Sequence, residues 1–170
     1  MAELANIVFD TNQAEQVAQL FLDAPEIAGD EFKRALTESL ALLENQVKER
    51  TPLGVGGRAS GLAGSISTAL SGQAVDLQGK VFSSYAYAEA VELGTKPHFP
   101  PVVPLIDWAE AILDLSREQA RQVGYLIALK ISHRGTKGKH MFEGAFTDNK
   151  GKVLSMFGDA IDRITNRLGR

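Results

Sequence analysis

The longest regular pattern in the chain is a helical one between Asp30 and Arg50. Its apolar residues recur at spacings of four, four, three and four: Phe32, Leu36, Leu40, Leu43 and Val47. This spacing places them on one face of an α-helix. Thr51 follows and precedes Pro52, and the residue before a proline is disfavoured in the helical conformation. The pattern therefore predicts a long helix that ends near Arg50 and buries one side.

Upstream of this helix the chain is less regular. Residues 7–9 are apolar and mostly β-branched, which favours a short strand, and residues 13–23 have helical spacing. Pro25 and Gly29 then interrupt the spacing. The pattern allows either one bent helix or two separate helices before Arg50.

Three further helices are predicted in the C-terminal half. One covers residues 105–113, and Ser116 with Gln119 forms a capping box at the start of the next, which Gly135 ends. The last runs from residue 153 to residue 168 with one apolar stripe. The only tryptophan, Trp108, lies on the apolar face of the first of these helices. We expect its indole to pack against the long helix at Leu36, Leu40 and Leu43.

The segment between the helices combines glycine with strand-like patterns. Residues 53–64 hold five of the sixteen glycines and predict a flexible arm. Strands are expected within residues 65–70 and 74–93, with turns at 71–72 and 78–79. Alternate residues of the second segment share one face of a pleated strand: Val81, Tyr85, Tyr87, Val91 and Leu93.

A further short strand is expected at residues 141–146. The elements together predict a single α+β domain over residues 1–170. We expect a long N-terminal helix, a small antiparallel sheet, a long C-terminal helix and a glycine-rich extended loop.

Composition narrows the classes of function. The net charge is −3 and the sequence pI about 5.6, which disfavours a general nucleic-acid binder, although contact with DNA at one local patch is left open. The absence of cysteine removes disulfides, thiol catalysis and cysteine metal sites. The N-terminus lacks a signal-peptide pattern, and no apolar run reaches the ~20 residues of a membrane helix. We expect a soluble protein, without membrane contact, made in a cytoplasm.

No pattern of catalytic or cofactor-binding residues is present. The glycines at 54–57 are not followed by the Lys-Ser/Thr of a phosphate-binding loop, and Ser65 does not lie in a nucleophile elbow. His98, His133 and His140 are 35 and 7 residues apart, without the spacing of a helical metal motif. A metal site would require the fold to bring a histidine to Glu89 or Glu92. We therefore expect no enzyme activity, no cofactor and no metal.

A compact basic turn is the most prominent charge feature. Arg134, Lys137 and Lys139 lie within six residues, next to His140 and around two glycines. Either they form a solvated loop, or they contact an acidic neighbouring subunit or DNA phosphates. Tyr85 and Tyr87 have no cations between them, so we interpret them as interface or half-buried residues and not as platforms for stacked bases.

Four short motifs resemble those of a known family. A long helix ends near a proline, a glycine-containing loop follows, a tyrosine-bearing segment leads into Gly-Thr-x-Pro-His, and a helix then runs into Arg-Gly-Thr-Lys. The matching residues are Gly61-Leu62-x-x-Ser65-Ile66, Tyr87-Ala88, Val91-Glu92-x-Gly94-Thr95-x-Pro97-His98, Arg134-Gly135-Thr136-Lys137 and Phe142-x-x-Ala145. Over residues 30–168 the chain resembles the small tail-completion or neck proteins of long-tailed bacteriophages, the head-tail joining family.

The resemblance implies a structural subunit of the virion, without catalysis, located where the capsid meets the tail. Its implied partners are other copies of itself in a ring, expected to be six-fold, around the DNA channel, together with other neck and tail proteins. Alternatives are a tail terminator, a head-closure protein or a tail-assembly protein of the same particle, and a small hydrolase using His98 and Glu92.

Segments that carry no catalytic groups are the candidates for contacts between subunits. We expect these contacts at the glycine-rich arm, the tyrosines and the proline-braced corner: Gly54, Gly56, Gly57, Arg58, Tyr85, Tyr87, Thr95, Lys96, His98 and Phe99. At the corner, Gly94 is expected to adopt a positive φ just before Thr95.

Overall fold

The computed structural model describes residues 11–54, 61–72 and 76–169. Its elements in chain order are α1 (Thr11–Arg50), α2 (Gly61–Gly64), β1 (Ile66–Ser71), β2 (Gln78–Ser83), α3 (Ala88–Leu93), β3 (Gly94–Thr95), α4 (Val102–Leu113), α5 (Arg117–Arg134), β4 (Thr136–Lys137) and α6 (Met141–Leu168). The predicted α+β class, with long first and last helices, is confirmed. No helix among these elements combines the length and the apolar character needed to cross a membrane.

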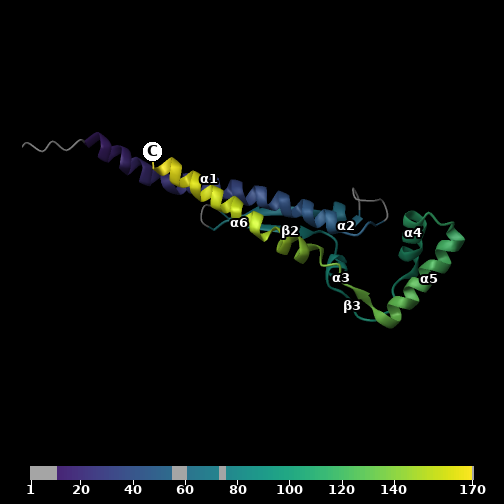
Figure 1. Ribbon diagram of the computed structural model, residues 1–170. Helices are drawn as coiled ribbons and strands as arrows, with labels where there is room; N and C mark the ends of the chain where they lie inside the picture. The colour runs from purple at the N-terminus through teal and green to yellow at the C-terminus, as the bar shows by residue number, and fades with distance from the viewer. Residues whose placement is uncertain (1–10, 55–60, 73–75, 170) are drawn as a thin grey trace, which may run out of the picture.

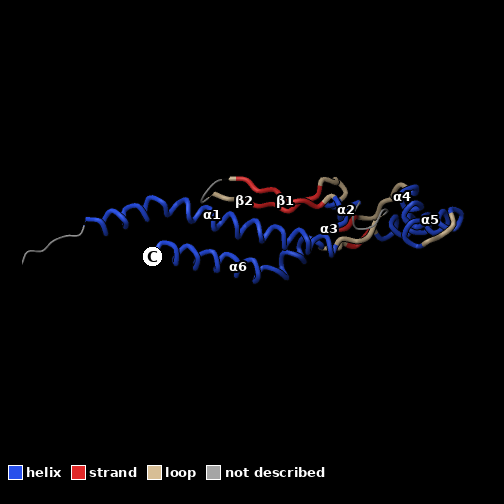
Figure 2. The backbone as a smooth tube through the Cα atoms, turned by 90° about the horizontal axis from the view of Figure 1, so that it is seen from above, coloured by secondary structure: helices blue, strands red, loops and turns tan. Residues whose placement is uncertain are grey.

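Two long antiparallel helices, α1 and α6, form the body of the molecule (Figures 1 and 2). Their contacts run in opposite chain order. Near the end of α1, Arg50 pairs with Asp148 at 2.6 Å, and further back the Ser39 hydroxyl donates to the Met156 sulfur at 3.4 Å. The ring centroids of Phe32 and Phe157 lie 6.4 Å apart. The apolar face that the sequence predicts on α1 is therefore covered in part by α6.

The sheet β1–β2 covers another side of α1. It is antiparallel, with Ile66 opposite Ser83 and Ser71 opposite Gln78. In Figure 2 α1 lies between this sheet and α6. The core of the body joins all these elements and is small; its buried members are Val47, Leu62, Ile66, Ala88, Met141 and Ala145.

The helices α4 and α5 form a hairpin that projects from one end of the body (Figure 1). Small residues of α5 face α4, namely Ala120, Gly124 and Ala128, and all three are buried. The hairpin has a core of its own around Ile106, Ala109 and Ala120. Arg117 joins the two helices through Asp107 and Glu110, with N–O distances of 2.6 and 2.7 Å.

Most helix boundaries match the sequence predictions. The helix α1 is continuous through Pro25, which decides between the one-helix and two-helix alternatives, and it ends at Arg50. The Ser116–Gln119 capping box is present at the start of α5, and Gly135 ends that helix. The predicted strand at residues 7–9 lies outside the described residues.

The strand predicted over residues 85–93 is wrong. Residues 88–93 form α3, and Tyr85 and Tyr87 lie in the turn before it. Over so short a segment, alternating apolar residues also fit helical spacing, since Ala88 and Val91 fall on one face. Alanine, glutamate and leucine favour the helix. The predicted turn at residues 78–79 is also wrong, because both residues belong to β2.

Two other local predictions fail for related reasons. The strand expected at residues 141–146 is the first part of α6. The flexible arm was expected to reach residue 64, but residues 61–64 form α2 with Leu62 and Ala63 buried. Residues 55–60 of this arm lie outside the described residues.

Trp108 does not pack against the long helix as predicted. It belongs to the hairpin core, where it packs against Ile106, Ala109 and Ala120. Its indole N–H donates to the Leu53 carbonyl at 3.4 Å. The apolar face of α4 packs against α5 within the hairpin. The apolar face of α1, against which Trp108 was expected to pack, instead contacts α6 and the β1–β2 sheet and is partly exposed to solvent.

One partly buried ion-pair cluster joins the middle of α1 to the C-terminal end of α6. The Glu31 carboxylate, only 9% exposed, accepts from Arg163 at 2.7 Å and from Arg167 at 3.3 Å. The hydrogen bond from Arg163 lowers the pKa of Glu31 below its ordinary value of 4.5, while burial opposes this shift. The charged carboxylate is therefore favoured in the folded protein.

We predict that acid weakens the contact between α1 and α6. Because the folded pKa of Glu31 is depressed, its contribution is present above about pH 4.5 and is lost as the pH falls through the folded value. The melting temperature of Glu31→Gln should fall less between about pH 6 and pH 3 than that of the unmodified chain. Glu110→Gln, which removes an exposed pair with Arg117 in the hairpin, is the control and should retain the full dependence.

Candidate functional site

The two turns that stand out in the sequence lie side by side at the junction of body and hairpin. Strand β3 pairs antiparallel with β4, placing Gly94 opposite Lys137 and Thr95 opposite Thr136. The Thr95 and Thr136 hydroxyl oxygens are 3.0 Å apart, and the Thr136 amide donates to the Thr95 hydroxyl at 3.2 Å. Two segments separated by about forty residues thus form one joint.

Backbone contact at this joint leaves no room for side chains. Gly94 has a φ of 81°, which confirms the predicted positive value. A Cβ atom on Gly94 would lie 2.3 Å from the Thr136 carbonyl oxygen, and one on Gly135 would lie 2.0 Å from the Thr95 carbonyl oxygen. Such distances are far below van der Waals contact, so both positions require glycine.

The joint continues into the start of α6. The Lys139 amide donates to the Val91 carbonyl at 2.9 Å, and the His140 amide donates to the Glu92 carbonyl at 3.1 Å. His140 adopts a left-handed conformation before the helix and makes no capping bond with its own side chain. The backbone amides of the first turn of α6 have no acceptor within the helix, so they need one from elsewhere in the chain.

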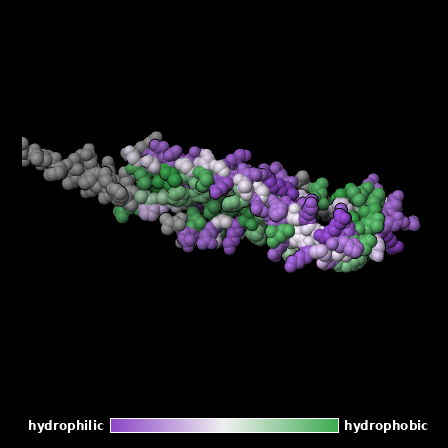
Figure 3. All heavy atoms as spheres, turned by 60° about the horizontal axis from the view of Figure 1, so that its bottom comes forward, coloured by the Kyte–Doolittle hydropathy of each residue, from purple (hydrophilic) through white to green (hydrophobic). Residues whose placement is uncertain are grey.

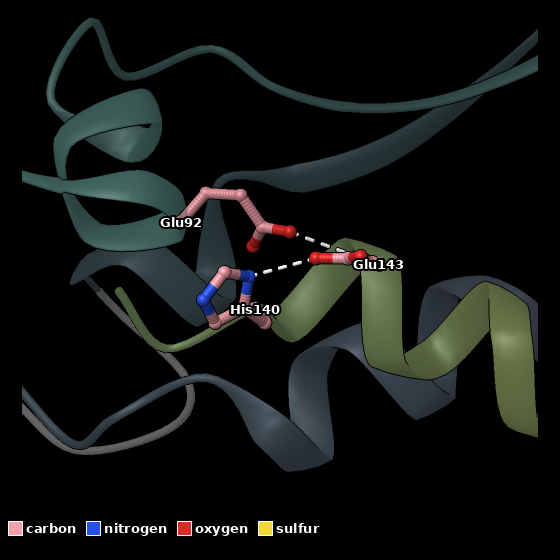
Figure 4. Close-up of side chains that lie close together, drawn as sticks. All are labelled: Glu92, His140 and Glu143. Carbon is pink, nitrogen blue, oxygen red and sulfur yellow. Dashed lines mark hydrogen bonds and ion pairs between the residues drawn. The ribbon is translucent and has the colours of Figure 1, made fainter. Parts of the chain in front are cut away.

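Glu92 is that acceptor (Figure 4). Its Oε2 accepts from the Phe142 amide at 3.0 Å, and its Oε1 accepts from the Glu143 amide at 2.9 Å. A carboxylate at this place also fits the positive end of the helix dipole. The residue that caps α6 thus comes from α3, fifty positions earlier, and binds the two segments together.

Glu92 also belongs to a group of three possible metal ligands. Its carboxylate, His140 and Glu143 offer ligand atoms that lie within 4.8 Å of one another, and His140 Nδ1 lies 2.7 Å from Glu143 Oε2. Both Glu92 oxygens already accept amides, and the helix N-terminus disfavours a cation there. The arrangement therefore acts as a cap. The sequence indicated Glu92 and the histidines but missed Glu143, which the three-residue spacing from His140 could have suggested.

The cations of the basic turn lie on the outside of the joint. Arg134, Lys137 and Lys139 are exposed, as is Lys96 on the facing segment. None of the four forms an ion pair within the part of the chain that the structure describes. The pairing of β3 and β4 brings the two segments that carry these charges side by side.

The other residues of the corner are spread along the segment that leads into the hairpin. His98 donates from Nδ1 to the Lys96 carbonyl at 2.9 Å, and its amide donates to the Ile131 carbonyl at 3.4 Å. Phe99 is exposed and lies edge-on to Tyr125, with ring centroids 6.3 Å apart.

The remaining candidates lie apart from the joint. Tyr85 and Tyr87 are exposed, and their rings stack with centroids 5.3 Å apart. Partial burial raises the pKa of Tyr87, and the neighbouring Tyr85 adds to this. Gly54 is half-buried near the end of α1. Gly56, Gly57 and Arg58 lie outside the described residues.

Comparison with known proteins identifies no relative: no family model, no curated protein and no solved structure matches this chain.

We predict that Gly94→Ala destabilises the fold by more than ~1 kcal/mol, because the new Cβ would collide with the Thr136 carbonyl at a positive φ. The matched control is Gly151→Ala in α6, where an added Cβ meets nothing within 4 Å. That change should stabilise the helix by about 0.5–1 kcal/mol. Urea unfolding of both variants measures the difference, and equal midpoints would contradict a close approach at Gly94.

A second prediction separates a helix cap from a metal site at Glu92. Glu92→Ala should destabilise the chain by about 1 kcal/mol or more, because two amides lose their acceptor. Glu143→Ala, which removes only an exposed contact with His140, should have a much smaller effect. Zinc and a chelator should each leave the melting temperature unchanged. A rise with zinc that both variants abolish would show a metal site instead.

Proposed function

We propose that this chain is a non-catalytic structural subunit of a tailed-phage virion, acting at the junction of capsid and tail as a neck or tail-completion protein. In this proposal several copies, expected to be six, form a ring around the DNA channel and contact other neck and tail proteins. Alternative positions in the same particle are those of a tail terminator, a head-closure protein or a tail-assembly protein.

The observation that carries this proposal is the amount of apolar surface left uncovered. The enclosed cores consist largely of alanine and a few larger side chains, and the largest fully buried residues are Ile66, Met141 and Ser39. Large apolar side chains are exposed on both the body and the hairpin; they include Phe82, Phe99, Tyr125, Leu126, Phe146, Leu154 and Ile161. Apolar side chains that gather on a surface, as Figure 3 shows along the body, mark protein interfaces.

The surface view agrees with this distribution. Figure 3 shows hydrophobic residues gathered along the body between hydrophilic margins, and again at the hairpin end. The motifs that carry the resemblance also occupy connected places. Gly94-Thr95 pairs with Thr136-Lys137. Glu92 caps the first turn of α6, the helix that carries Phe142 and Ala145. A shared structural role of these motifs supports a family relation more than scattered matches would.

The basic turn fits the same proposal. Exposed cations that have no acidic partner among the described residues suit an acidic neighbour or the phosphates of DNA in a channel. In a ring, symmetry places the same cations of every subunit at one radius.

The proposal predicts a specific assembly defect. A stop codon in the gene, in the phage or prophage that encodes it, should leave DNA-filled heads and complete tails that do not join. Electron microscopy of the lysate measures the joined fraction, and supplying the chain from a plasmid should restore it. Antibodies to the chain should label the capsid-tail junction of intact particles. Normal joining without the chain, or its absence from purified virions, would contradict the proposal.

A further inference from the structure

The hairpin carries an apolar patch on the side facing away from α4. Tyr125, Leu126 and Leu129 form this outer patch and are 54%, 63% and 39% exposed. Positions i, i+1 and i+4 lie within an arc of about 100° on a helix. The residues that pack on α4 occupy the opposite side of α5. Phe99 extends the patch through its edge contact with Tyr125.

The body carries a groove of matching character. It has a volume of about 470 Å³ and is lined by residues of three elements. Leu40 and Leu43 come from α1, Val81 from β2, and Phe142, Glu143 and Phe146 from α6. Phe146 stands at its edge, 59% exposed. Lys80 lies between Gly79 and Val81, and successive residues of a strand point to opposite faces, so its charge is directed away from the groove.

The two surfaces of one chain do not cover each other. In Figure 1 α5 lies at the far end of the molecule, beyond α4. Its outer patch is on the side of α5 opposite the residues that are buried against α4. The β3–β4 joint holds the hairpin in this position through backbone contacts that admit no side chain at Gly94 and Gly135. Among the described residues no element covers either surface.

We propose that the outer patch of one copy of this chain docks in the groove of the next copy. This rests on the proposed ring, since a contact between two different surfaces repeats by rotation and can close into a ring. It identifies which surfaces of the subunit meet.

Charge and size both favour a second copy as the occupant. Arg121 and Lys130 flank the outer patch, are exposed, and form no ion pair among the described residues. Glu143 lines the groove, so docking brings cations to a carboxylate. With Phe99, the exposed apolar side chains offer roughly half of the ~800 Å² per partner that a standard interface buries.

The absence of cysteine allows a direct test by disulfide cross-linking. Leu126→Cys and Phe146→Cys are made in separate copies of different tag length, mixed, and oxidised mildly at a concentration where the unmodified chain assembles. We expect a cross-linked pair only from the mixture. The double variant should give a ladder of multimers that ends at the ring. Ser67→Cys, on the exposed side of β1, replaces either partner as the control.

Two cross-linking results would overturn the docking. Self-linking of Leu126→Cys alone would show α5 against α5 in a two-fold contact. A mixture that links no better than the Ser67→Cys control would place the interface elsewhere.

A charge substitution gives an independent readout. Leu126→Asp should convert the assembly to monomers in light-scattering measurements, while Ala111→Asp, an equal charge on the exposed side of α4, should leave it intact. An assembly that survives Leu126→Asp would overturn this docking and leave the ring itself standing. A monomeric unmodified chain at all concentrations would also overturn it, whereas the virion location is decided separately by the joining defect and antibody labelling.

Discussion

The structure depends on the backbone contact between β3 and β4. At this joint the chain leaves the body, builds the hairpin and returns to start α6. The contact is close enough that Gly94 and Gly135 each lie against a carbonyl of the opposite segment. Because the hydrogen bonds continue through Lys139 and His140, the return segment is fixed before α6 begins. The direction of α6, and with it the pairing with α1, follows from this joint.

Glu92 is a second contact that fixes the start of α6. A helix of 28 residues begins at Met141 without a capping side chain of its own. The carboxylate from α3 supplies two acceptors where the helix has unsatisfied amides. The same core contains Ala88 of α3 and Met141 of α6, and Val91 of α3 packs against it. The cap and the core therefore stabilise the same contact between segments that are far apart in sequence.

Sequence analysis predicted the features that local patterns determine. The end of α1 before Pro52, the Ser116 capping box, Gly135 at the end of α5 and the positive φ of Gly94 are confirmed, because each depends on a few neighbouring residues. The start of α6 was missed because its cap, Glu92, lies fifty residues away. Residues 85–93 were misassigned because a short alternating pattern fits both periods. Trp108 was misplaced because an apolar helix face does not indicate which partner covers it.

The same limit explains why core and interface could not be separated from sequence. The apolar stripes of α1 and α6 look alike as patterns, yet Leu40, Leu43 and Val47 of α1 are buried while Ile161 of α6 is 52% exposed. The hairpin shows the same division on α5. Its side against α4 holds alanine and glycine together with Val123, while Tyr125, Leu126 and Leu129 on its other side are exposed. In the proposed ring, contacts between copies would cover this apolar area, which the described elements of one chain leave exposed.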